Sequence, residues 1–247
     1  NASSEPTPRV VAERDTALAS ALRYGAQILR RHGVRLALVF VGLLLPLWMF
    51  GELADEIHEQ EAIAFDEPLL LFAHSRARPD LDDFFMFMSK AGYAWGVVPF
   101  DIGLVIVLAV LRKYREAVFA AVALGGSALL NIGAKLAFAR GRPSLWESIA
   151  PETSYSFPSG HAMGSMTLAC VLFLLAWHTR WRWPVAALMG SFVVLVGWSR
   201  VYLGVHYPSD ILAGWAVASA WVAAVFLSVY RVHRRPWRLH ERRSQDT

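Results

Sequence analysis

Five long stretches of this sequence contain no aspartate, glutamate, lysine or arginine. They are residues 36–51, 117–134, 162–177, 183–199 and 211–230. At a rise of about 1.5 Å per residue, each helix of this length crosses most of a bilayer core of about 30 Å. A sixth apolar stretch, between Lys90 and Arg112, is interrupted only by Asp101. Lipid offers backbone groups no hydrogen-bond partner, so the sequence predicts an all-α polytopic membrane protein, a bundle of six transmembrane helices.

The basic residues are distributed unevenly around these stretches. Of 24 lysines and arginines, 17 lie in the four segments 1–35, 112–115, 180–182 and 231–247. The connection 52–83 instead carries ten acidic residues and two arginines. Because cytoplasmic loops are enriched in lysine and arginine, these four segments and both termini are expected in the cytoplasm. No small-residue cleavage site follows the first apolar stretch, so we expect it to remain as an anchor.

This distribution divides the chain into three parts. We expect a cytoplasmic N-terminal arm at 1–34, a membrane domain at 35–230 and a basic cytoplasmic tail at 231–247. The single cysteine, Cys170, lies within an apolar stretch and excludes an internal disulfide or a cluster of thiolate metal ligands.

Three short motifs stand at the ends of the apolar stretches. They are Lys135 with Arg142-Pro143, the tetrapeptide Pro158-Ser159-Gly160-His161, and Ser199-Arg200 followed by His206 and Asp210. In the predicted topology, all of them lie at the outer ends of four different helices. We therefore expect one site, in which Lys135, Arg142 and Arg200 bind a phosphate as cations. Ser159 and Gly160 would present backbone N–H groups at a helix N-terminus to the same anion.

The two motif histidines suit a covalent phosphoryl transfer. Asp210 can accept a hydrogen bond from one nitrogen of His206, which leaves the other nitrogen free to attack phosphorus. His161 can donate a proton to the leaving oxygen and later activate water. We expect a phospho-histidine intermediate and a reaction that requires no metal or other cofactor.

The ordered pattern K-x6-R-P, P-S-G-H, S-R-x5-H-x3-D resembles the motifs of the type-2 phosphatidic acid phosphatase superfamily. The resemblance covers Lys135 to Asp210, and every motif position carries the residue of that family. It implies a six-helix membrane bundle and a lipid phosphatase activity. The same motifs are similar to those of vanadium haloperoxidases, and a lipid transporter that uses the cations as a head-group site is a third possibility. Six membrane spans argue against the haloperoxidase.

The expected protein is a lipid phosphatase of the cytoplasmic (inner) membrane, with its active site at the periplasmic or extracellular side. Undecaprenyl diphosphate is the first expected substrate, because an outward-facing site suits carrier-lipid recycling. Phosphatidylglycerophosphate, phosphatidic acid and lipopolysaccharide precursors are alternatives. The expected partners are the lipid phosphate and the bilayer, not nucleic acid. The sequence leaves the oligomeric state open.

Two further features of the sequence call for structural interpretations. Asp101 lies in an apolar stretch just after Pro99, which favours the first turn of a helix near the outer surface. The run Phe84-Phe85-Met86-Phe87-Met88 is too short to span a bilayer, and docking on the bundle is its expected role.

Overall fold

The computed structural model describes residues 33, 36 and 38–230 of the chain. The chain divides into two units, residues 1–41 and residues 42–247, and the helix packing described below belongs to the second. The expected basic tail lies outside the described residues, and so does the expected N-terminal arm except for residue 33.

All regular elements within the described residues are helices. In chain order they are η1 (Phe40–Leu44), α2 (Leu45–His58), α3 (Asp66–His74), α4 (Pro79–Ala91), α5 (Val97–Val110), α6 (Tyr114–Phe138), α7 (Gly160–Ala176), α8 (Arg182–Tyr202) and α9 (Pro208–Val229).

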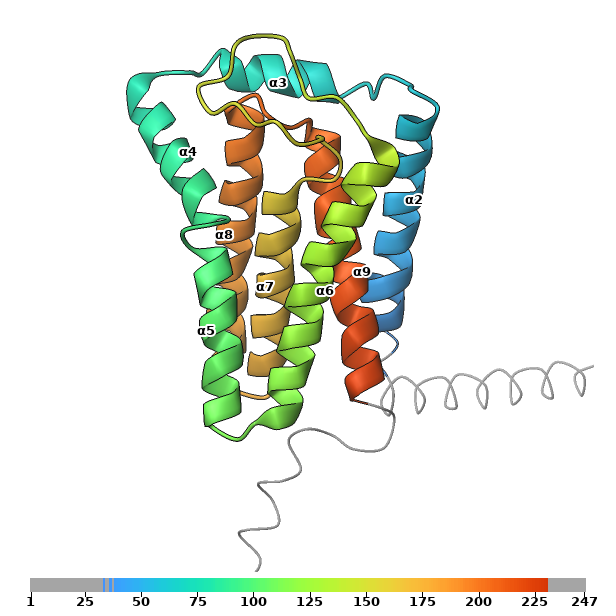
Figure 1. The fold of residues 1–247 in the computed structure, drawn as a ribbon, viewed down its shortest axis with the longest axis vertical. Coiled ribbons are helices and arrows are strands. Elements are labelled where there is room, and N and C mark those ends of the chain that lie inside the picture. The colour runs from blue at the N-terminus through green and yellow to red at the C-terminus, as the bar shows by residue number, and fades with distance from the viewer. Residues whose placement is uncertain (1–32, 34–35, 37, 231–247) are drawn as a thin grey trace, which may run out of the picture. The chain divides into compact units, whose positions relative to one another are not determined.

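Helix α7 occupies the centre of the bundle and packs against α6, α8 and α9 (Figure 1). Around this centre, α2 packs on α9, α5 on α6 and α4 on α8, while α3 lies across one end and contacts α8 and α9. The long connection between α6 and α7, residues 139–159, lies at the same end, which we call the site end. The turns α5–α6 and α7–α8 lie at the opposite end.

Small residues allow α9 to approach the N-terminus of α7 closely. Alanines recur along the buried side of α9, and a side chain at Gly214 would place its Cβ only 3.0 Å from the carbonyl oxygen of Ser159. In membranes, helices that pack without a hydrophobic driving force depend on such close contact. Because of this contact, the turn that begins α7 lies beside the first turn of α9.

Three helices, α6, α8 and α9, are long and apolar enough to cross a bilayer, with 25, 21 and 22 residues. Helices α5 and α7 are apolar but shorter, with 14 and 17 residues. The all-helical class and the membrane character are thus confirmed. The six-span count is not confirmed by helix length.

One predicted helix boundary was wrong. The first apolar helix does not end at Gly51 but continues as α2 to His58, because Glu52, Asp55 and Glu56 are exposed while Ile57 is buried. The acidic connection is therefore not a loop: it contains the end of α2, the whole of α3 and the start of α4. Charged residues on one exposed face interrupt an apolar stretch without ending a helix.

The predictions for Asp101 and for the aromatic run 84–88 have different outcomes. Helix α5 begins at Val97, so Pro99 lies in its first turn and Asp101 just beyond it, with Asp101 Oδ1 buried and without a hydrogen-bond partner in the described part of the chain. The aromatic run lies in α4, where Phe85 and Met88 are buried and Phe87 is exposed. Docking of this run on the bundle is confirmed.

Candidate active site

The site end gathers all the motif residues. Lys135 lies in the last turn of α6, and Arg142 lies in the following connection. Ser159 is the N-cap residue of α7, Arg200 lies in the last turn of α8, and Asp210 lies in the first turn of α9. Elements far apart in sequence therefore deliver their polar ends to one place, as the topology predicts.

A tight reversal after α8 positions His206. Gly204 has a φ of 68°, a left-handed conformation that residues with a Cβ rarely adopt, and the ring of Trp146 occupies the space where a Cβ would lie. The backbone N–H of His206 then donates to the carbonyl oxygen of Arg200, at 3.3 Å. This reversal places the His206 side chain, which is fully buried, beside Arg200 at the end of α8.

The hydrogen bonds of His206 define its tautomer. Asp210 Oδ2 lies 3.3 Å from His206 Nδ1, and a carboxylate can only accept, so Nδ1 carries the proton. On the other side of the ring, Arg142 Nη1 lies 3.2 Å from Nε2, and arginine can only donate. The lone pair of Nε2 therefore faces the guanidinium of Arg142. His206 precedes α9 rather than lying on it, so the contact with Asp210 does not depend on a shared helix.

His206 is neutral at physiological pH. Burial lowers the pKa of His206 to about 4, although the hydrogen bond and the charge of Asp210 act to raise this pKa. A neutral imidazole keeps the lone pair that a nucleophile needs.

Glu152 lies between the two arginines of the site. Arg142 Nη2 donates to Glu152 Oε2 at 2.7 Å, and Arg200 Nη2 donates to Glu152 Oε1. Burial raises the pKa of Glu152, but the charges of Arg200 and Arg142 outweigh burial and make the net shift downward. The Nε of Arg200 is buried and has no hydrogen-bond partner in the described part of the chain. The two cations thus hold a carboxylate, and one buried donor still needs an acceptor.

Lys135 and the turn before α7 complete the cationic side of the site. Lys135 Nζ donates to Ser154 Oγ at 3.0 Å and to the Tyr155 carbonyl oxygen at 2.6 Å. As predicted, the tetrapeptide 158–161 forms the turn into α7, where the Ser159 side chain accepts from the N–H of Ala162. A Cβ at Gly160 would lie 3.0 Å from Asn131 Oδ1, so only glycine fits without a shift.

His161 lies at the start of α7 and packs against Tyr93. The two ring centroids are 4.9 Å apart with an interplanar angle of 32°. Arg200, Lys135 and Arg142 lie close enough for their charges to act on His161, which locates it at the same site.

Sequence reasoning missed three charged residues of this site: Glu152, Arg140 and Asp66. Arg140 Nη1 donates to Asp210 Oδ1 at 2.6 Å, and Arg140 Nη2 donates to Asp66 Oδ2 at 2.9 Å. Arg140 lies only two residues before the motif arginine, but its partner Asp66 is in the acidic connection 52–83. Nothing in the sequence pairs residues 66 and 140.

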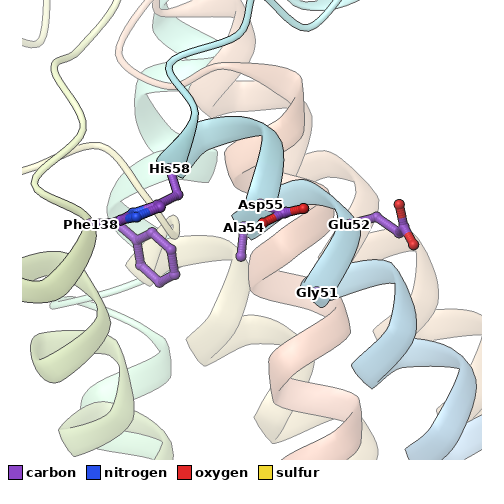
Figure 2. A pocket seen from close by; sticks show the side chains of 6 residues that line it. All are labelled: Gly51, Glu52, Ala54, Asp55, His58 and Phe138. Carbon is purple, nitrogen blue, oxygen red and sulfur yellow. The ribbon is translucent and has the colours of Figure 1, made fainter.

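A pocket opens between α2 and the end of α6, and none of the motif residues lines it. Figure 2 shows its walls, formed by five residues of α2 and by Phe138: Gly51, Glu52, Ala54, Asp55, His58 and Phe138. Within the described residues, no group of three or more His, Cys, Asp or Glu side chains is placed to hold a metal ion.

Known proteins match both the motif segment and most of the rest of the chain. The sequence profile of the PAP2 superfamily matches residues 116–234. The chain is 31% identical over 173 residues to phosphatidylglycerophosphatase B of Bacillus subtilis, a match that covers 67% of this chain and 83% of that protein. It is also 46% identical over 77 residues to an undecaprenyl-diphosphatase of Sulfolobus acidocaldarius, covering 31% of this chain and 34% of the archaeal protein.

A solved structure extends the similarity to three dimensions. The transmembrane PAP2-type phosphatidylglycerolphosphate phosphatase of Bacillus subtilis superposes with a TM-score of 0.67 at 27% sequence identity. The superposition covers 77% of this chain and 98% of the other. Most of the helix arrangement is therefore shared with a membrane phosphatase.

Proposed function

This chain belongs to the PAP2 superfamily, and we propose that it is a membrane lipid phosphatase that works through a phospho-histidine intermediate. The observation that supports this proposal best is the position of His206: its Nε2 lone pair faces Arg142, and its Nδ1 donates to Asp210. A phosphate bound by Arg142, Arg200 and Lys135 would lie against that lone pair.

The proposed reaction has two steps. Nε2 of His206 attacks the terminal phosphorus, the bond from that phosphorus to the ester oxygen or to the bridging oxygen of a diphosphate breaks, and His161 protonates the departing oxygen. Water then attacks the phospho-histidine, His161 takes a proton from that water, the bond between phosphorus and Nε2 breaks, and inorganic phosphate leaves. The cations and the N–H groups of the Ser159-Gly160 turn stabilise the charge on the phosphoryl oxygens in both steps. A phosphate oxygen would also supply an acceptor for the buried Nε of Arg200.

We propose that this end of the bundle faces away from the cytoplasm and that the six apolar stretches, α5 and α7 among them, all span the membrane. The turns at the opposite end carry Arg112, Lys113 and Arg180, the kind of residue that stays in the cytoplasm. Trp181 and Trp183 lie beside that last turn and are 57% and 65% exposed, as in an interfacial aromatic belt.

The two relatives favour different substrates. Undecaprenyl diphosphate is our first candidate, because the segment with the higher identity matches an undecaprenyl-diphosphatase. Phosphatidylglycerophosphate is the second, because the relative that matches most of the chain is named a phosphatidylglycerophosphatase. Both lipids present a terminal phosphate to the same cations.

Phosphate release from purified protein tests the proposal. The panel contains undecaprenyl diphosphate, phosphatidylglycerophosphate and phosphatidic acid in detergent micelles, with EDTA present throughout. We expect release of one inorganic phosphate per lipid and a preference for one of the first two. Lipid movement between vesicles without phosphate release would support a transporter instead, and halide oxidation that requires added vanadate would support a haloperoxidase.

Removing the charge of Glu152 should strengthen phosphate binding. In Glu152→Gln, Arg142 and Arg200 lose the carboxylate that now lies between them, so inorganic phosphate no longer competes with it. We expect the inhibition constant of inorganic phosphate to fall by roughly 3- to 10-fold, or about 0.7–1.4 kcal/mol. The control is Glu147→Gln, an exposed residue in the same connection. Unchanged or weaker inhibition in Glu152→Gln would show that this carboxylate does not occupy the anion position.

Cysteine labelling tests the orientation. In a Cys170→Ala background, Glu147→Cys places a thiol at the site end and Arg180→Cys places one at the opposite end; both positions are exposed. An impermeant maleimide added to right-side-out vesicles should label only the former, and added to inverted vesicles only the latter. The reverse pattern would move the site to the cytoplasmic side.

A further inference from the structure

We propose that Arg140 is a positioning residue, which ties the Asp210 carboxylate to Asp66 of α3 and so holds Asp210 toward His206. The proposal rests on the proposed function, because it concerns the same nucleophile. It adds two residues that act through Asp210: Arg140, at an unspecified position of the first motif, and Asp66, outside the three motifs.

The hydrogen bonds divide the Asp210 carboxylate into two halves. Oδ1 accepts from Arg140 Nη1, at 2.6 Å. Oδ2 accepts from His206 Nδ1, from the backbone N–H of Tyr207 at 2.9 Å and from the Ser156 hydroxyl. Arg140 therefore fixes the oxygen that does not face the imidazole, and the carboxylate cannot rotate without breaking this ion pair.

Both terminal nitrogens of the Arg140 guanidinium donate to protein acceptors. Besides Asp210, its Nη1 donates to Ser209 Oγ at 2.8 Å, and its Nη2 donates to Asp66 Oδ2 at 2.9 Å. Its Cζ lies 4.1 Å from the centroid of the Tyr207 ring. Both terminal nitrogens and one face of this side chain are thus occupied, which suits a structural link better than phosphate binding.

Asp66 anchors the other end of the link. It is the first residue of α3, is 4% exposed, and accepts from the Ser209 N–H at 2.8 Å and from the Ser209 hydroxyl at 2.5 Å. Ser209 is in the first turn of α9, where unpaired N–H groups favour a carboxylate. Helix α3 is in this way fastened to the turn that carries Asp210.

The link predicts how His206 titrates. The charged groups that face His206 are Asp210 from α9, Arg200 from α8, Lys135 from α6, His161 from α7, and Arg142 and Glu152 from the connection. Of these, Asp210 acts to raise the pKa of His206, and Arg140 offsets part of the Asp210 charge. Loss of Arg140 should therefore raise the pKa of His206. Asp66→Asn should lower this pKa, because the charge of Arg140 is then no longer shared with Asp66 and offsets more of the Asp210 charge.

The test combines kinetics and titration in three variants. Arg140→Met should lower kcat by roughly 10- to 100-fold through misplacement of the nucleophile. It should leave KM nearly unchanged, because Arg140 does not touch the phosphate, and it should move the acid limb of the kcat/KM profile to higher pH. Arg140→Lys keeps one charge but not the two-nitrogen link, so it should recover only part of the loss. Asp66→Asn should move the acid limb the other way.

The double variant separates a link from a simple field effect. If Asp66 acts through Arg140, the shift caused by Asp66→Asn disappears in the Arg140→Met background. If Asp66 acts directly on His206 through space, the shift persists there, and the proposal is overturned. A wild-type kcat in Arg140→Met, or a fall that appears only in KM, also overturns it.

NMR titration of histidine-labelled protein in micelles reads the same pKa without turnover. The His206 signal is assigned by its absence in His206→Gln. A wild-type protein that releases no phosphate from any lipid contradicts the proposed function, while the opposite shifts of His206 in Arg140→Met and Asp66→Asn still support the link. If Arg140→Met does not fold, the direction in which the His206 pKa moves in Asp66→Asn and in Arg140→Lys decides the question. An unchanged His206 pKa in both variants overturns the link.

Discussion

Phosphate release falls by at least about 10⁴-fold when His206 is replaced by alanine, if His206 is the nucleophile. The loss is this large because the proposed reaction has no other group to form the bond to phosphorus. The cations that bind phosphate remain, so the variant should still bind inorganic phosphate. Steady-state release from micelles measures the first effect, and inhibitor binding measures the second.

The matched control for this variant is His58→Ala. His58 is exposed at the end of α2 and lies outside the motif segment, so its loss should leave the rate unchanged. Samples of wild-type protein with ³²P-labelled substrate, quenched with detergent at alkaline pH, should contain a base-stable, acid-labile phospho-enzyme that is absent from His206→Ala. Substantial turnover in His206→Ala, or label retained on that variant, would remove His206 from the reaction.

The second large effect separates the two histidines by the leaving group. His161→Ala should slow hydrolysis of an alkyl phosphate by about 10²–10⁴-fold, the usual contribution of a general acid. An aryl phosphate with an acidic phenol needs little protonation, so formation of the phospho-enzyme from it should be nearly normal. Hydrolysis of this phospho-enzyme lacks His161 as its base, so the phospho-enzyme should accumulate. Burst and steady-state rates on both esters measure these steps.

His206→Ala on the same two esters is the control for this comparison. A nucleophile cannot be bypassed by a better leaving group, so this variant should fail on both. Equal losses on the two esters in His161→Ala, without trapped phospho-enzyme, would contradict the assignment of His161 as acid and base. Loss of packing against Tyr93 alone would affect both esters equally, which the same data distinguish.

The sequence predicted the helical class and the location of the motif residues for one physical reason. A bilayer excludes charged side chains and unpaired backbone groups, so charge-free stretches locate helices and the charges next to them locate helix ends. Lys135, Arg200 and Asp210 lie near the ends of α6, α8 and α9, as this reasoning requires.

Helix boundaries in the acidic segment were not predictable in this way. The carboxylates of α2 occupy an exposed face, and the buried Ile57 lies among them. Counting charges along the sequence predicts that the helix ends at Gly51, whereas its backbone hydrogen bonds continue to His58. A count of charges also gives no sign that Asp66, within this acidic segment, is almost fully buried.

The sequence alone predicted which residues would bind and attack a phosphate, because the motif spacing and the topology both bring them to one end of the bundle. Only the tertiary structure decided how they are connected: that Glu152 lies between Arg142 and Arg200, and that Asp66 reaches Asp210 through Arg140. These pairs join segments up to 74 residues apart. Such ion pairs form only where packing brings the segments together and excludes water, and no local pattern records that proximity.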